Sequence, residues 1–272
     1  MKRQPLLQQA DLYLTRTSNV TTTTMNTKKA TNAATTDAAA IIAAHTKKEM
    51  YIFLASIDFL TDSSLFERAL QFASKERQQR ALAYTYPSGK ARSLGAALLL
   101  DEALRRTNSQ IPLPAEIIRN EYGSPSIKNE PSVFISISHA GNYAAAGVSS
   151  SAIGVDIETI RKCNSGLCKK CFAQDEQELI FSQKTKEDTD LAFSKSWTRK
   201  ESYIKAIGKG LAQPLAQFSA LNDEIIIEEK RTNFFCKTYR PKEDCIFSVC
   251  STKKDFPKEI SIIDLHKTLL EF

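Results

Sequence analysis

The stretch that decides the fold is VFISISHAGNYAAAGVSSSAIGVDIE, residues 133–158. It contains three apolar, largely β-branched or Ala-rich runs, at 133–138, 143–148 and 153–157, and short turns such as Ala140-Gly141-Asn142 separate them. Apolar runs of about four to eight residues with turn residues between them are typical of strands. The centre of the chain is therefore predicted to form a β-sheet.

The segments on either side of this centre repeat one order of elements. Upstream, a predicted buried strand at 51–57 precedes helices at 64–84 and 90–107, which have apolar residues at helical spacing. Downstream, helices at 175–182 and 188–207 precede four short strands near 224–229, 233–239, 246–250 and 260–263. Helices followed by strands, twice over, predict an α+β protein of two tandem lobes, over residues 50–150 and 151–272.

Residues 1–49 differ in composition from the rest. They are rich in Thr, Ala, Asn and Gln, with four consecutive threonines at 21–24. Such a segment cannot bury enough apolar surface to offset chain entropy, so a disordered extension is expected. Its high Thr and low acidic content also resembles an organellar transit peptide, and the sequence does not indicate its role.

The bulk composition narrows the functional classes. The 272 residues are 42% hydrophobic, and no run of about 18 apolar residues suggests a membrane span. The six cysteines are expected to be reduced thiols in a cytoplasmic protein. Most of the net charge of +6 lies in residues 1–49, so the remainder is almost neutral and gives little support to nucleic-acid binding.

The segment Gly154-Val155-Asp156-Ile157-Glu158 is the first candidate site. On a strand, alternate residues share a face, so both carboxylates point one way and both apolar side chains enter the core. Two close carboxylates repel each other unless a cation lies between them, and Mg²⁺ prefers such oxygen ligands. The alternative is an ordinary strand with an acidic outer face.

The second candidate site is the segment Trp197-Thr-Arg-Lys-Glu-Ser-Tyr-Ile-Lys205. Trp197, Glu201 and Lys205 recur at intervals of four and therefore share a helix face. Glu201 would supply a third carboxylate, while Lys200 and Lys205 would neutralise phosphate oxygens. The alternative is a surface helix with a Glu–Lys pair.

His139 ends the strand Phe134–His139 and is the only histidine in the middle of the expected fold. A histidine in this position can donate to a phosphate. A Ser-His hydrolase built on Ser138 and His139 is disfavoured, because adjacent strand residues point apart and no G-x-S-x-G motif occurs.

A competing signal comes from Cys163, Cys168 and Cys171, whose spacing is that of three ligands in plant-type ferredoxins. No full pattern of four ligands is present, and Lys169 and Lys170 lie among them. Loop thiols without a cofactor are the favoured interpretation.

The three candidate motifs together closely resemble those of the 4′-phosphopantetheinyl transferases of the surfactin-synthetase-activating type. The resemblance rests on Ser138-His139, Gly154–Glu158, Trp197–Lys205 and the following Gly208-Lys-Gly-Leu211, and it extends from about residue 51 to the end. It implies two pseudo-symmetric lobes, each with helices on a small, mostly antiparallel sheet, and coenzyme A bound in the cleft between them.

The resemblance also implies roles for individual residues. Asp156, Glu158 and Glu201 would ligate Mg²⁺. The coenzyme A contacts would be Arg77, Arg80, Arg92, Tyr122, Gly123, Ser124, Pro125, Ser138, His139, Lys200 and Lys205. The family usually has Lys where this chain has Ser124, and Lys is common where it has Arg77 and Arg80. For each Arg, the alternative is a solvated helix face.

The implied reaction transfers 4′-phosphopantetheine from coenzyme A to a serine of an apo acyl or peptidyl carrier protein and releases 3′,5′-adenosine bisphosphate. Glu201 or Glu158 would accept the serine proton, and Lys205 or Lys200 would stabilise the leaving phosphate. The expected carrier is a small acidic protein, and the enzyme is expected to be a monomer. The rivals are another Mg²⁺-dependent nucleotidyl or phosphoryl transferase and a nucleic-acid binder with a basic tail.

Overall fold

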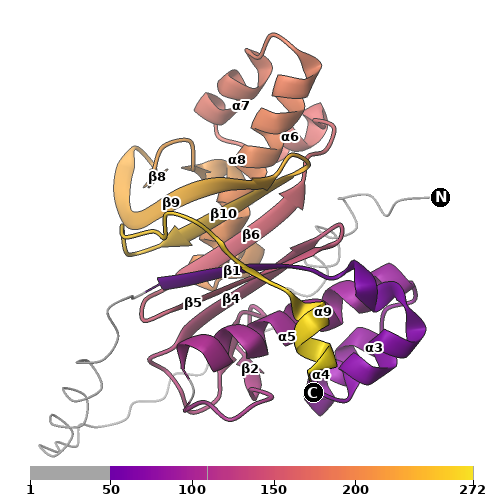
Figure 1. Ribbon diagram of the computed structural model, residues 1–272. Helices are drawn as coiled ribbons and strands as arrows, with labels where there is room; N and C mark the ends of the chain where they lie inside the picture. Colours follow the sequence, from indigo (N-terminus) through magenta and orange to yellow (C-terminus); the bar gives the residue numbers. More distant parts are fainter. Residues whose placement is uncertain (1–49, 109, 272) are drawn as a thin grey trace, which may run out of the picture. The chain divides into compact units, whose positions relative to one another are not determined.

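The structure is a computed structural model that describes residues 50–108 and 110–271. The extension expected to be disordered, residues 1–49, lies outside the described residues. Two sheets organise the described part, with one group of helices beside each sheet (Figure 1). The α+β class predicted from the order of elements is confirmed.

The first sheet has the strand order β11-β1-β5-β4. Strands β1 (Met50–Ser56), β5 (Tyr143–Ser149) and β4 (Phe134–Ala140) are antiparallel neighbours. Helix α5 (Pro87–Thr107) packs on this sheet and buries Leu94, Leu99 and Leu104 there. The apolar runs of the central segment are therefore the strands that its pattern predicted.

The helix predicted at 64–84 is two helices. Asp62 caps α3 (Ser63–Leu70) by accepting from the N–H groups of Ser64 and Leu65. Ser74 then caps α4 (Lys75–Leu82) by accepting from the N–H of Arg77. Each side chain satisfies N–H groups that a helix start leaves without partners, so a second helix begins inside the predicted one.

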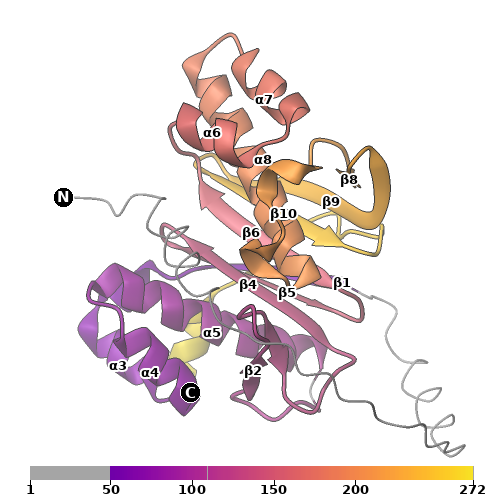
Figure 2. The same cartoon turned by 180° about the vertical axis from the view of Figure 1, so that it is seen from behind.

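The second sheet has the strand order β6-β10-β9-β8-β7. All of its pairings are antiparallel, between β6 (Ile153–Thr159), β10 (Cys245–Ser251), β9 (Lys230–Lys242), β8 (Glu224–Ile227) and β7 (Phe218–Ser219). Helix α8 (Lys186–Ile207) packs across β6 and β10, as the view from behind shows (Figure 2). Helices α6 (Ser165–Cys171) and α7 (Gln174–Phe181) precede it.

The two sheets meet where β4 lies along β6. Two serines of β4 make this seam, because their side chains accept hydrogen bonds from β6: Ser136 Oγ from Val155 N–H at 3.0 Å, and Ser138 Oγ from Ile157 N–H at 3.4 Å. Side-chain oxygens thus replace the carbonyl groups that a neighbouring strand would present. The seam aligns the strand that carries His139 with the strand that carries Asp156.

The C-terminal segment joins the first sheet rather than the second. Strand β11 (Ser261–Ile263) pairs in parallel with β1, and α9 (Leu265–Leu270) buries Leu265 and Leu269 in the core of the first sheet. The sequence-based division assigned these residues to the second lobe. The sequence of a three-residue strand does not indicate which strand it pairs with. Only the folded structure therefore shows that the C-terminal segment returns to the first sheet.

The turn Tyr122–Pro125 lies in a small hairpin of β2 (Ile117–Arg119) and β3 (Pro125–Ile127). Gly123 has a φ of 81°, a conformation that glycine adopts without a steric cost. Asn120 donates from its side chain to the carbonyl of Gly208 at 2.9 Å. This contact brings the hairpin against the end of α8.

Candidate active site

Strand β6 presents its two acidic residues on one face. Val155 and Ile157 are buried in the core between the sheets, whereas Asp156 and Glu158 point to the opposite face. Asp156 is 5% exposed, and Glu158 is half-buried. The alternation expected from the strand pattern positions both carboxylates toward helix α8.

Glycine at position 154 allows α8 to approach β6 closely. A Cβ atom at Gly154 would clash with the carbonyl oxygen of Ser202 and the backbone nitrogen of Ala206. Because the helix backbone lies directly on the strand at this point, Glu201 and Lys205 come beside the two carboxylates. The glycine of the motif is thus explained by packing.

Lys205, Asp156 and Ser138 form one polar cluster. Lys205 Nζ lies 2.7 Å from Asp156 Oδ1 and donates to Ser138 Oγ at 2.9 Å, while Ser138 donates to the same carboxylate oxygen at 2.8 Å. This cluster links α8, β6 and β4. Ser138, expected to contact coenzyme A, therefore also holds Asp156 and Lys205 together.

The remaining carboxylates share their environment with Asp156. Burial and then the negative charge of Asp156 raise the pKa of Glu158 to about 7 and that of Glu201 to about 7. The positive charges of Arg161 and Lys205 act in the opposite direction on both groups. A carboxyl group with a pKa near neutrality is suited to accept and release a proton at physiological pH.

The donor set suits a hard divalent cation, although the three carboxylates do not form a ready-made ligand shell. Asp156 Oδ2 is buried and has no hydrogen-bond partner in the described part of the chain, which leaves one oxygen for a cation. Within residues 50–108 and 110–271, no group of three His, Cys, Asp or Glu side chains is placed to hold a metal ion. Lys205 and Arg161 instead neutralise Asp156 and Glu158.

Positive charges gather around His139. Burial and then the charges of Lys205, Arg92 and Arg80 lower the pKa of His139 to about 4. The imidazole is therefore neutral at physiological pH, and the cations that surround it would attract an anion. Arg92 also lines a small recess with Gly141 and Asn142, next to the turn that follows His139.

Lys200, for which a phosphate contact was expected, is buried and paired within the protein. Its side chain is 0% exposed, forms an ion pair with Glu176 at 2.7 Å, and donates to the carbonyls of Leu215 and Phe218. A buried ammonium requires such partners, because leaving it unpaired costs several kcal/mol. Lys200 therefore points away from Lys205 and into the packing between α7, α8 and β7.

Arg77 and Arg80 occupy different environments on α4. Arg77 is 6% exposed and lies 3.5 Å from Glu76, and its Nη2 has no hydrogen-bond partner among the described residues. Arg80 is about half exposed and 3.8 Å from Glu76. Only Arg80 contributes to the charges that lower the pKa of His139.

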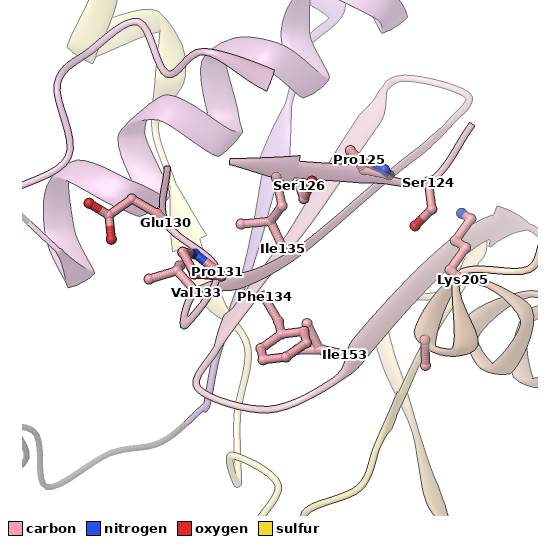
Figure 3. Close-up of a pocket in the computed structure, with 11 residues that line it drawn as sticks. Ser124, Pro125, Ser126, Glu130, Pro131, Val133, Phe134, Ile135, Ile153 and Lys205 are labelled. Atoms are coloured by element: carbon pink, nitrogen blue, oxygen red, sulfur yellow. The ribbon is translucent and has the colours of Figure 1, made fainter. Parts of the chain in front are cut away.

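Ser124 and Lys205 lie side by side at one end of a pocket of about 110 Å³ (Figure 3). Pro125, Phe134 and Ile153 supply apolar walls. The hairpin turn expected on the coenzyme A side is thus adjacent to Lys205, whereas Tyr122 is exposed at the tip. This pocket lies beside the polar cluster and gives it an apolar flank.

Sequence reasoning missed Arg161. Its guanidinium donates to Glu158 at 3.1 Å and lies over the ring of Trp197, 5.4 Å from the ring centroid. The residue lies three positions after Glu158, where a strand motif gives no reason to look for its partner. The aromatic residue of the helical motif could have signalled a nearby cation, since Arg commonly stacks on Trp.

The six cysteines are free thiols, and the ferredoxin-like spacing has no counterpart in space as a metal site among the described residues. Cys168 and Cys171 are on α6, and both are buried.

Two sheets joined through β4 and β6, with a lysine–carboxylate cluster and a group of cations at the seam, form an α+β protein with a candidate active site. A family model described as the 4′-phosphopantetheinyl transferase superfamily matches residues 152–257, which include β6 and α8.

Curated relatives agree with this match. The 4′-phosphopantetheinyl transferase ffp of Bacillus subtilis is 29% identical over 208 residues, which cover 75% of this chain and 92% of the relative. The transferase Sfp of Bacillus subtilis strain 168 is 28% identical over the same shares. The transferase gsp of Aneurinibacillus migulanus is 32% identical over 58% of this chain and 65% of the relative. The chain belongs to the 4′-phosphopantetheinyl transferase superfamily.

Proposed function

We propose that this enzyme transfers the 4′-phosphopantetheine moiety of coenzyme A to a serine of an apo acyl or peptidyl carrier protein. The observation that carries the proposal is the polar cluster of Asp156, Lys205 and Ser138, with Glu158 and Glu201 beside it and the cations near His139. Family membership narrows this chemistry to one transfer reaction.

The cationic side chains would bind the phosphates of coenzyme A. Arg92, Arg80 and Lys205 supply the positive charge, and neutral His139 has an N–H to donate. Tyr122, Gly123, Ser124 and Pro125 would contact the nucleotide from the hairpin. We assign Arg77 a weaker role, because it is buried against α5.

A proton must leave the carrier serine as its oxygen attacks the β-phosphorus of coenzyme A. Glu158 and Glu201 lie beside Asp156 and Lys205, and we assign the acceptance of this proton to one of these two carboxylates. The bond between the β-phosphorus and the bridging oxygen breaks, and 3′,5′-adenosine bisphosphate leaves. Lys205 would stabilise negative charge on the leaving phosphate.

Mg²⁺ is proposed as the cofactor, held by Asp156, Glu158 and Glu201. The unpartnered Oδ2 of Asp156 supports this assignment. When bound, the ion would offset the negative charge of the pyrophosphate. To hold it, Asp156 and Glu158 would share or give up their contacts with Lys205 and Arg161, which would then be free to meet the substrate phosphates.

We also propose a cytoplasmic monomer that acts on a small acidic carrier. Both sheets that build the site come from one chain, and all six thiols are free, as in a reducing compartment. The cations around His139 favour an acidic partner. No helix of the described residues is long and apolar enough to cross a membrane.

The first prediction tests the site and the function together. Asp156→Asn keeps the shape of the side chain but removes its charge, so transfer should fall at least about 100-fold. Intact-mass spectrometry of a panel of apo carriers, incubated with coenzyme A and Mg²⁺, would measure the added arm. The matched control is Glu116→Gln, which removes a carboxylate that is 69% exposed and should leave transfer unchanged.

Different results of this assay would contradict the proposed function and the proposed metal site. A wild-type protein that modifies none of the carriers would overturn the function. An Asp156→Asn variant that transfers at the wild-type rate would leave the function standing and overturn the assignment of the metal site.

A further inference from the structure

Two thiols meet at the start of α6. Asn164 caps this helix by accepting from Leu167 N–H at 3.0 Å, so Cys163 precedes the cap and Cys168 lies in the first turn. Side chains at these two positions commonly pack together and fix the angle at which the chain enters a helix. Here both are cysteines, and their Sγ atoms are 3.6 Å apart.

The backbone holds both residues in place. Cys163 N–H donates to the Asp190 carboxylate on α8 at 2.7 Å, and Cys168 N–H donates to the Asn164 carbonyl at 2.9 Å. A disulfide requires the two sulfurs to approach from 3.6 Å to about 2.05 Å. The pair is thus pre-positioned by contacts that do not involve the thiols.

Only one of the six thiols is accessible to an external reagent. Cys163 is partly exposed, whereas Cys168, Cys171, Cys236, Cys245 and Cys250 are buried. Cys236 and Cys250 also face each other, on β9 and β10, but neither has access to solvent. The pair at the start of α6 therefore combines an entry point with a buried partner, and the sheet pair does not.

We propose that Cys163 and Cys168 form a reversible disulfide, a modification site at the start of α6 that is separate from the proposed transfer reaction. The oxidant is a low-molecular-weight disulfide such as glutathione disulfide. The bond would join the segment that leaves β6, five residues after Glu158, to the first turn of α6.

The exchange takes place in two balanced steps. Cys163 loses its proton and its thiolate attacks one sulfur of glutathione disulfide, which releases one glutathione thiolate and leaves a mixed disulfide. Cys168 then loses its proton and attacks the Cys163 sulfur, which releases the second glutathione. The two protein thiols are oxidised, and one glutathione disulfide is reduced to two glutathione molecules.

The rate at which the Cys163–Cys168 disulfide forms should depend on pH. Burial raises the pKa of Cys163 above its usual value, and burial together with the neighbouring Cys163 sulfur raises the pKa of Cys168 to about 12. Because the thiolate is the attacking form, we expect slow oxidation at neutral pH and faster oxidation in mildly alkaline buffer.

The test uses the folded full chain incubated with glutathione disulfide, followed by acid quenching, denaturation, alkylation of free thiols and digestion with trypsin. Cleavage after Lys162 and Lys169 releases residues 163–169 as one peptide that contains both cysteines. We expect this peptide to escape alkylation and to be lighter by two hydrogen atoms. Dithiothreitol should restore two alkylated cysteines.

Variants separate this pair from other thiols. Cys171→Ser should form the bond like the wild type, whereas Cys163→Ser, at the partly exposed position, should not. Peptides that contain Cys236 and Cys250 should remain fully alkylated. The proposal is overturned if Cys163 stops at a mixed disulfide with glutathione, if a cross-link to Cys171 appears instead, or if residues 163–169 stay reduced throughout.

Discussion

Two lysines of α8, Lys200 and Lys205, lie five residues apart but differ in burial and in their ion-pair partners. Lys205 is 29% exposed at the side chain and pairs with Asp156 at the candidate site. Lys200 is fully buried with Glu176, and burial lowers its pKa although Glu176 acts in the opposite direction. Both lysines belong to one motif, but only Lys205 lies at the candidate site. A motif lists residue types and does not distinguish a structural lysine from a binding one.

The second prediction concerns Lys200. Lys200→Met leaves Glu176 buried and without its charged partner, so the free energy of unfolding should fall by about 3–5 kcal/mol. Urea denaturation would measure the loss. Lys195→Met is the matched control, because Lys195 is exposed on the same helix and its replacement should cost less than about 0.5 kcal/mol. A Lys200→Met protein that is stable but binds coenzyme A more weakly would instead support a contact between Lys200 and a phosphate of coenzyme A.

The third prediction concerns Asp101 on α5. Burial raises its pKa to about 6, although Ala115 N–H donates to it at 3.0 Å and Arg77 is near. The Asp101 carboxyl group thus binds its proton more tightly in the folded protein than in the unfolded chain, where its pKa is near 3.8. The contribution of this carboxyl group to stability is therefore greatest below pH 3.8 and is lost as the pH rises through about 6.

Asp101→Asn keeps an oxygen for Ala115 but does not ionise. We expect it to raise the free energy of unfolding by about 1–3 kcal/mol at pH 7.5 and to change it little at pH 3.5, as measured by urea denaturation at each pH. Asp255→Asn, at an exposed position, should change it little at either pH. A loss of stability at pH 7.5 would show instead that attraction to Arg77 outweighs the cost of burial.

At the level of elements, the site depends on the contact between β6 and α8. The fourth prediction is that Gly154→Ala destabilises the fold by about 1–3 kcal/mol and also slows transfer, because the added methyl group forces Glu201 and Lys205 away from Asp156. Denaturation and the carrier assay would measure the two effects.

Gly166→Ala is the matched control. It adds the same methyl group to a helix where the nearest atom, Asn164 Oδ1, is 3.4 Å away, so stability should stay the same or rise by up to about 1 kcal/mol. Equal effects of the two substitutions would show that the closeness of β6 and α8 is not what the site requires.

Most elements could be predicted because each has a local signal. The central strands show apolar runs between turns, and α8 has a long amphipathic pattern that ends at Gly208, which adopts the left-handed conformation. The break between α3 and α4 was missed, since Ser74 is one polar residue among many until it caps a helix. Helix α6 was also missed, because its seven residues are too few to establish a period.

The candidate site was predictable as far as its residues lie in strand or helix motifs. Alternation on β6 correctly predicted which side chains face away from the core. The clustering of Ser138, Asp156 and Lys205 depends on contacts between distant segments, and no local pattern encodes those contacts. The pairing of Arg161 with Glu158 and the burial of Lys200 depend on neighbours from other elements in the same way.

At the level of the whole molecule, the fifth prediction tests the return of the C-terminal segment to the first sheet. Leu269 is 4% exposed in the core of that sheet, whereas its neighbour Leu270 is 54% exposed. Leu269→Ala should lower the free energy of unfolding by about 2–5 kcal/mol, as measured by urea denaturation. Leu270→Ala should change it by no more than about 0.5 kcal/mol, and equal effects would place α9 outside the core.

The parallel pairing of β11 with β1 also affects the order in which the protein can fold during synthesis. A ribosome makes β1 about 200 residues before β11, so one edge of β1 has no partner until residues 261–263 have emerged. An unpaired strand edge can recruit another chain. Nascent copies on one messenger RNA are therefore exposed to edge-to-edge association, and a premature stop codon just before residue 261 would make that exposure permanent.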